Sequence, residues 1–146
     1  MTMKSNFFCK RFDGYVDEIV TSCQVYNTDG AYVNCEATWD TGAECSVISD
    51  TLVKKLNLKG LTKAKMYHAG GDYNIVNCHD VYIGLTNEMI IGPLRVMEGQ
   101  YGEDYILIGM DIIGSGDLIV TNNGEHTEMT FNIPSTLKTD DIRKLL

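Results

Sequence analysis

Apolar and polar residues alternate along the chain from Ala31 to Asp40. The odd positions carry Ala, Val, Cys, Ala and Trp, and the even positions carry Tyr, Asn, Glu, Thr and Asp. A repeat of two residues is typical of a β-strand with one buried face, so the side chain of Asp40 is expected on the other face. Gly42 follows, where a chain can turn sharply or let another backbone approach closely. The pattern therefore predicts a carboxylate at a rigid strand end, beside a tight turn.

A second alternating stretch, Ile19 to Asn27, precedes this strand, and we predict that the two form a hairpin. A three-residue loop at 28–30 would pair odd positions with odd positions and make Cys23 and Cys35 cross-strand neighbours. A two-residue loop would instead set the apolar face of one strand against polar residues of the other. We therefore expect the longer loop, with Gly30 in the left-handed conformation and the two cysteines as free thiols.

The rest of the chain predicts mainly short strands. Ser49 is expected to cap a short helix whose inner stripe is Leu52, Val53 and Leu56. Other expected elements are an edge strand with a turn at 7–15, strands at 65–68, 72–76, 81–85, 89–96, 105–108, 118–122 and 128–133, a helical turn at 109–113, and a capped helical turn at 139–146. These elements predict an all-β protein with one or two short helices, forming a single domain over 1–146 with its core at about 16–134 and a C-terminal tail at 135–146.

Composition narrows the class of protein. The chain has 146 residues, of which 44% are hydrophobic and only two are proline, as expected for one compact domain. Its formal charge of −8, without a basic cluster, argues against nucleic acid as a partner. No apolar run approaches the roughly 20 residues of a membrane span. We therefore expect a cytoplasmic protein with no membrane partner.

Cysteine usage favours reduced thiols over disulfides or metal ligands. The five cysteines are an odd number and form no Cys-x-x-Cys pair. Cys78 and His79, taken with Cys35 or His68, match the spacing of no common zinc site. We therefore expect no metal and no cofactor.

Two ordered motifs suggest a family. Asp40-Thr41-Gly42-Ala43 ends an apolar strand, and about 65 residues further on the chain reads Ile106-Leu-Ile-Gly-Met-Asp-Ile-Ile113. Together they resemble the aspartic proteases of the retroviral type, the retropepsins, over about Val16 to Pro134. The resemblance implies a single-lobed retropepsin-like acid protease barrel. It also implies an aspartic endopeptidase in which Asp40 is the catalytic residue.

The resemblance further implies a homodimer. Aspartic proteolysis needs two carboxylates that share one proton, and this chain has a single Asp-Thr-Gly triplet. Asp40 and its symmetry mate would then meet on the two-fold axis. In the family, the residues matching Thr41, Gly42 and Ala43 support the two carboxylates. Met110 stands where the viral enzymes have an arginine that helps to hold the dimer together.

The substrate site implied by the resemblance has two parts. Ala69-Gly70-Gly71 lies between two β-prone runs and indicates a hairpin tip, which could be an ordinary surface turn. It lies about 30 residues after Asp40, where the family has the flap that closes over the peptide. With His68 these residues would contact the peptide from above. Thr38, Tyr105 and Leu107 fall where the family lines its substrate pockets.

Two other functions are compatible with the same residues. The first is a catalytically silent retropepsin-fold module that binds peptides or dimerises, with Asp40 as a structural hydrogen-bond acceptor. The second is a small β-barrel interaction protein. The intact Asp-Thr-Gly-Ala motif and the glycine-rich hairpin favour the peptidase, with a peptide or protein as its substrate.

Overall fold

The computed structural model describes residues 6–138, 140 and 143–144. None of the helices in this part of the chain is long and apolar enough to cross a membrane. The elements, in chain order, are β1 (Phe7–Arg11), β2 (Val20–Tyr26), β3 (Tyr32–Trp39), β4 (Val47–Ser49), α1 (Asp50–Lys55), β5 (Thr62–Tyr67), β6 (Tyr73–Gly84), β7 (Ile90–Gly99), β8 (Tyr105–Ile108), α2 (Met110–Ile113), β9 (Asp117–Asn122) and β10 (Thr127–Asn132). The prediction of an all-β protein with two short helices is confirmed.

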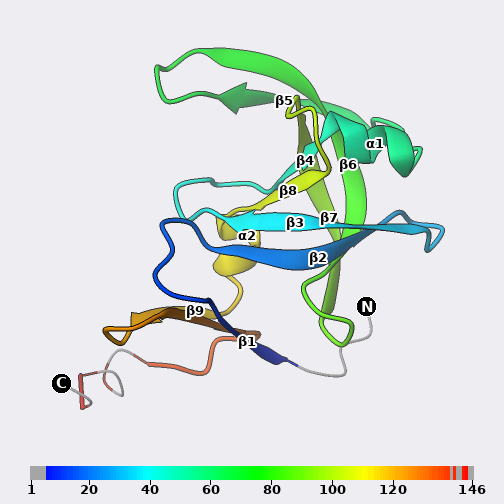
Figure 1. Ribbon diagram of the computed structural model, residues 1–146. Coiled ribbons are helices and arrows are strands. Elements are labelled where there is room, and N and C mark those ends of the chain that lie inside the picture. Colours follow the sequence, from blue (N-terminus) through cyan, green and yellow to red (C-terminus); the bar gives the residue numbers. More distant parts are fainter. Residues whose placement is uncertain (1–5, 139, 141–142, 145–146) are drawn as a thin grey trace.

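Six strands close into a barrel. The larger sheet has the order β2-β3-β8-β4-β7-β6-β5, and β2 also pairs with β6. The β2–β6 pairing joins the two sides of the sheet and leaves β5 outside the closed ring, paired only with the outer half of β6. The hairpin of β5 and β6 therefore extends beyond the barrel and arches over the loop that follows β3 (Figure 1).

A three-stranded sheet of order β1-β10-β9 lies against this barrel. Its link to the barrel is an aromatic cluster of Phe8, Trp39 and Phe131, in which the Trp39 and Phe131 ring centroids are 5.0 Å apart. Phe131 is fully buried and Trp39 is nearly so. Because burying an aromatic side chain removes a large apolar area from water, this cluster anchors the end of β3, where Asp40 follows.

The predicted hairpin register is confirmed. Residues of β2 and β3 pair odd with odd, Cys23 opposite Cys35 and Val25 opposite Val33. Gly30 has a φ of 91°, in the left-handed region that favours glycine. Both cysteines are free thiols, with their Sγ atoms 3.3 Å apart.

The predicted helix cap is also confirmed. The Ser49 side chain accepts a hydrogen bond from the N–H of Leu52, as an N-cap residue does. Leu52 and Leu56 are buried and Val53 is half-buried, so the inner stripe faces the core as expected. The predicted strand at 7–15 is shorter than expected and ends at Arg11, but it does lie at a sheet edge and turns at Gly14.

Several predicted elements differ from the structure, among them strand β5, which runs from Thr62 to Tyr67 instead of over 65–68. The ranges 72–76 and 81–85 belong to one continuous strand, β6, which pairs with β5 in its first half and with β7 in its second. The polar residues between those ranges hide this continuity, although Cys78 and His79 are both buried. Strand β7 runs on to Gly99, beyond the predicted end at 96, and the three-residue strand β4 was not predicted. The helical turn predicted at 139–146 lies largely outside the described residues.

Asp117 fixes the segment that follows β10. Its carboxylate accepts hydrogen bonds from the Ser135 hydroxyl (2.5 Å), the Thr136 N–H (2.7 Å), the Asn132 amide (3.0 Å) and the Leu137 N–H (3.1 Å). These donors, the Ser135 hydroxyl foremost, hold the pKa of Asp117 well below its usual range. The carboxylate therefore stays ionised in acid, where it continues to hold residues 135–137.

Asp117→Ala is expected to lower the thermal midpoint of the protein, and the size of the loss should depend on pH. A carboxyl whose pKa is lowered in the folded state adds stability above its unfolded pKa of about 3.9 and loses it as the pH falls further. The difference between wild type and variant should thus be constant from pH 7 to about pH 5 and should shrink below pH 4. Thermal unfolding over pH 3 to 7 measures this, and a difference independent of pH would contradict it.

Candidate active site

Backbone pairing places Asp40 at the mouth of the barrel. The last residue of β3, Trp39, lies opposite Ile108 of the parallel strand β8. The Asp40 N–H donates to the Ile108 carbonyl (2.9 Å), and the Trp39 indole N–H donates to the buried Thr21 hydroxyl (2.9 Å). The residue before Asp40 is therefore fixed in the core, while the Asp40 side chain is partly exposed.

The turn after Asp40 orients its carboxylate. The Gly42 N–H donates to Asp40 Oδ1 (2.8 Å), and the Ala43 N–H donates to the Asp40 carbonyl (3.3 Å). A Cβ atom on Gly42 would lie 3.1 Å from the same carboxylate oxygen, which is closer than side chains normally approach. Glycine thus allows the amide to reach the carboxylate and to fix its orientation.

The second motif packs directly behind this turn. A Cβ atom on Gly109 would lie 2.8 Å from the backbone of Cys45 and 2.9 Å from the carbonyl oxygen of Ala43. The Met110 N–H donates to the Ala43 carbonyl (2.7 Å). Only a residue without a side chain allows the β8–α2 junction to approach the Asp40 turn this closely.

Asp111 holds the two motifs together. Its carboxylate accepts hydrogen bonds from the Ser46 N–H (2.8 Å), the Ser46 hydroxyl (2.7 Å) and the Ile112 N–H (2.9 Å). The Ser46 hydroxyl oxygen in turn accepts from the Gly109 N–H (3.1 Å), and Ser46 is fully buried. This network satisfies donors that would otherwise be buried without partners.

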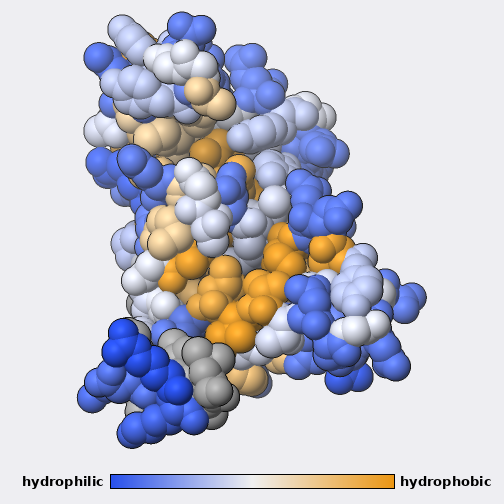
Figure 2. Space-filling model, turned by 90° about the vertical axis from the view of Figure 1, so that its left-hand side faces the viewer, coloured by the Kyte–Doolittle hydropathy of each residue, from blue (hydrophilic) through white to orange (hydrophobic). Residues whose placement is uncertain are grey.

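A hollow of about 490 Å³ opens beside Asp40. Three residues expected to contact substrate, Thr38, Tyr105 and Leu107, line it together with Asp40 and Thr41. Apolar side chains of Ile19, Leu118 and Val120 complete its wall, and Asp17 and Glu18 lie at the same hollow. Figure 2 views the side towards which the Asp40 turn projects and shows apolar side chains gathered on this face. The hollow is therefore suited to an apolar side chain beside a carboxylate.

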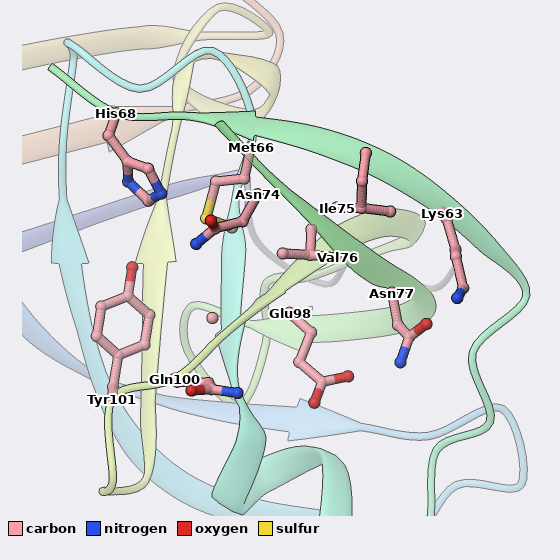
Figure 3. A pocket seen from close by; sticks show the side chains of 11 residues that line it. Lys63, Met66, His68, Asn74, Ile75, Val76, Asn77, Glu98, Gln100 and Tyr101 are labelled. Atoms are coloured by element: carbon pink, nitrogen blue, oxygen red, sulfur yellow. The ribbon is translucent and has the colours of Figure 1, made fainter. Parts of the chain in front are cut away.

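A second hollow, of about 690 Å³, lies under the β5–β6 hairpin. His68 and Met66 line it from the hairpin, and Tyr101 lines it from the segment after β7 (Figure 3). The hydroxyl of Tyr101 points across the opening towards His68 (Figure 3). An extended chain lying under the hairpin would meet side chains from above and below.

The hairpin tip carries the glycines. Ala69, Gly70 and Gly71 are all exposed. The turn is closed by hydrogen bonds from the His68 N–H to the Asp72 carbonyl (2.8 Å) and from the Gly71 N–H to the His68 carbonyl (3.0 Å), and Gly71 has a φ of 87°. Further back, Met66 and Tyr67 share a hollow with Gly42 and Ala43, so the hairpin lies over the Asp40 turn.

Several residues of these hollows were not predicted. Tyr101 lies between the predicted strands at 89–96 and 105–108, and its ring is 4.9 Å from that of Tyr105. Burial foremost, followed by Tyr105 and the charge of Asp40, raises the pKa of Tyr101, which places this hydroxyl in the electric field of the carboxylate. An aromatic residue among polar neighbours was the signal in the sequence that could have identified Tyr101. Glu98, Asp17 and Glu18 offered none, because exposed acids are common in any sequence.

Cys45 also lies near the turn, but its state argues against a nucleophilic role. Burial foremost, then the charges of Asp111 and Glu44, raises the pKa of its thiol. The thiolate is the reactive form of cysteine, and a raised pKa makes that form scarcer.

Comparison with known proteins gives matches among solved structures alone. No family model and no curated protein matches the chain. A retropepsin-like aspartic protease from Rickettsia conorii matches with a TM-score of 0.50 and 14% identity, covering 87% of this chain and 96% of that one. An inhibitor complex of the EIAV protease matches with a TM-score of 0.49 and 20% identity, covering 67% and 86%. The retroviral protease-like domain of Ddi1 from Leishmania major matches with a TM-score of 0.48 and 18% identity, covering 86% and 98%.

At these identities the likeness concerns the fold. The match to the Rickettsia structure extends over most of both chains and agrees with the barrel described above. The chain therefore has the single-lobed fold of the retropepsin-like aspartic proteases, as its two motifs predict.

Proposed function

We propose that this protein is an aspartic endopeptidase that is active as a homodimer. The observation that supports it best is the Asp40 carboxylate, oriented by the Gly42 N–H at 2.8 Å and lying beneath a glycine-tipped hairpin. One hollow opens beside Asp40 and another lies under the hairpin, and together they have room for an extended peptide. If Asp40 served only as a structural hydrogen-bond acceptor, the fold would need neither an open hollow beside it nor a hairpin above it.

The Asp40 carboxylates of the two protomers would together hydrolyse the peptide bond. When two carboxylates lie close together, they cannot both ionise, so one stays protonated. The ionised group takes a proton from the attacking water, and the protonated group donates to the carbonyl oxygen of the scissile peptide bond. Thr41, exposed at the same turn, would contact its symmetry mate across the axis.

The face around Asp40 is suited to a second copy. Val120 and Met110 are 44% and 41% exposed, and apolar residues gather on this face in Figure 2. Exposed apolar groups of this kind are typical of protein interfaces. Met110 would add an apolar contact where the viral enzymes have a charged one.

The proposal is tested by incubating the protein with a denatured protein mixture across pH 4 to 7, with and without an aspartic protease inhibitor. We expect new peptide fragments that the inhibitor abolishes, with an optimum on the acid side of neutral. Absence of fragments, while peptides still bind, would favour the silent peptide-binding module instead.

Peptidase activity is expected to rise more steeply than the first power of protein concentration when the protein is dilute. Each monomer supplies one carboxylate, so only the dimer turns over. Activity and sedimentation should be measured over the same dilution series. Activity strictly proportional to concentration, where sedimentation finds only monomers, would rule out a shared active site.

Gly70→Val is expected to lower turnover about tenfold while changing stability by no more than about 0.5 kcal/mol. A Cβ atom at this position meets nothing within 4 Å, so the folded state tolerates it. Valine would nevertheless reduce the backbone freedom that closure over a peptide requires. Peptide cleavage and thermal unfolding measure the two effects.

Asn87→Val, at an exposed turn outside all three hollows, is the matched control and should leave cleavage unchanged. Hydrogen exchange of residues 66–75 should slow on saturation with an inhibitor. Unchanged exchange together with full activity in Gly70→Val would show that this hairpin is not a flap.

A further inference from the structure

We propose that Glu98 forms a subsite for a positively charged side chain of the bound peptide, lysine or arginine, with His79 positioning its carboxylate. This proposal rests on the proposed function, because it assigns a substrate class to the same cleft. It concerns the hollow under the β5–β6 hairpin, at a distance from the reacting carboxylate.

Glu98 lies on β7 and its side chain enters this hollow beside Asn77 and Gln100 (Figure 3). The side chain is only 23% exposed. Around it the lining is polar, and the amides of Asn77 and Gln100 can accept hydrogen bonds from a cation. A peptide side chain that extends under the hairpin would therefore meet a partly dehydrated carboxylate.

His79 supports this carboxylate from the core side. Its side chain is 2% exposed, and its Nε2 lies 2.7 Å from Glu98 Oε2. Within the described residues, His79 Nδ1 is buried without a hydrogen-bond partner. The contact with Glu98 is thus the one side-chain hydrogen bond that the His79 ring makes among the described residues, and it fixes the carboxylate from the core side.

Glu98 has no lysine or arginine partner in the part of the chain that the structure describes. Other half-exposed acids do have one: Asp80 pairs with Arg95 (2.9 Å) and Asp104 pairs with Lys55. Lys63 lines the same hollow but is exposed and forms no ion pair with Glu98. A half-buried carboxylate of this kind is stabilised when a cation enters, and closure of the hairpin would strengthen the attraction by excluding water.

The test uses a positional-scanning library of decapeptides in which one position at a time holds lysine, arginine, norleucine, glutamine or glutamate. For wild type we expect one position at which lysine or arginine raises kcat/KM about tenfold over norleucine. Glu98→Gln, which keeps an acceptor for His79, should bring this ratio close to one. Glu98→Lys should reverse it in favour of glutamate.

Glu88→Gln is the matched control, since Glu88 is an exposed acid in the turn between β6 and β7 and its loss should leave the ratio unchanged. Cleavage without a preference for a cation, or a preference that survives in Glu98→Gln, would overturn the subsite while leaving the peptidase intact.

The same library, labelled with fluorescein, should also be tested for binding to Asp40→Asn by anisotropy. If wild type cleaves nothing but this variant binds cationic peptides about tenfold more tightly, the subsite holds and the peptidase proposal fails. If neither cleavage nor binding depends on the charge of the peptide, Glu98 has no such role.

Discussion

Asp40→Asn is expected to lower kcat at least a thousandfold without unfolding the protein. General acid-base catalysis contributes on the order of 10²- to 10⁴-fold for one group, and in the proposed homodimer the substitution removes both carboxylates at once. Asparagine keeps the shape of the side chain and can still accept the hydrogen bond from the Gly42 N–H. It cannot exchange a proton with the attacking water. Peptide cleavage at the acid optimum measures the effect, and sedimentation shows whether the variant still dimerises.

Asp29→Asn is the control, because Asp29 is an exposed acid in the turn between β2 and β3 and lies in none of the three hollows. Its activity should equal that of wild type. Turnover by Asp40→Asn at the rate of wild type would refute the peptidase proposal. A variant that is inactive because it is unfolded would be recognised by its thermal midpoint.

The second large effect is expected at Asp111. Asp111→Ala should lower the free energy of unfolding by about 3 kcal/mol, since it leaves the backbone N–H and the hydroxyl of buried Ser46 without an acceptor and each such donor costs about 1–3 kcal/mol. Peptidase activity should fall by more than the loss of folded protein explains, because the Ser46 hydroxyl also accepts from the Gly109 N–H behind the Asp40 turn. Chemical denaturation and peptide cleavage measure the two quantities.

Asp111→Asn separates geometry from charge. Its amide oxygen can accept from the Ser46 N–H, and its amide N–H can donate to the Ser46 hydroxyl. This variant should therefore retain most of the stability and activity. Equal losses in the alanine and asparagine variants would show that the negative charge of Asp111, rather than its hydrogen bonds, supports the turn.

The sequence predicts the neighbourhood of Asp40 well because two simple rules apply there. Alternation of apolar and polar residues indicates which face of β2 and of β3 is buried. Only the hairpin register with Cys23 opposite Cys35 brings the two apolar faces together. Gly109 is a comparable signal, because a glycine at the end of an apolar strand is typical of a site where another backbone approaches closely. Both signals are local, and each is sufficient without knowledge of the rest of the fold.

The hollows could not be predicted in the same way. The one under the hairpin is lined from β5, β6, β7 and the segment after β7, and no sequence rule brings Glu98 beside His79 before β6 and β7 are paired. Strand β6 was divided in the prediction because Asn77, His79 and Asp80 are polar, although the fold pairs them with β5 and β7. Tertiary contacts override the local pattern at these positions.

The strand pairings that position Asp40 connect distant parts of the chain, with a consequence for folding. Strand β3 pairs with β8 about 70 residues later, and β1 pairs with β10 across almost the whole described chain, Phe7 opposite Asn132. Proteins dominated by such distant contacts fold slowly, since a long loop must close before the contacts can form. A chain leaving the ribosome therefore carries the Asp40 turn without the segment that packs behind it until β8 and α2 have been synthesised. The order of synthesis itself delays the formation of the Asp40 site.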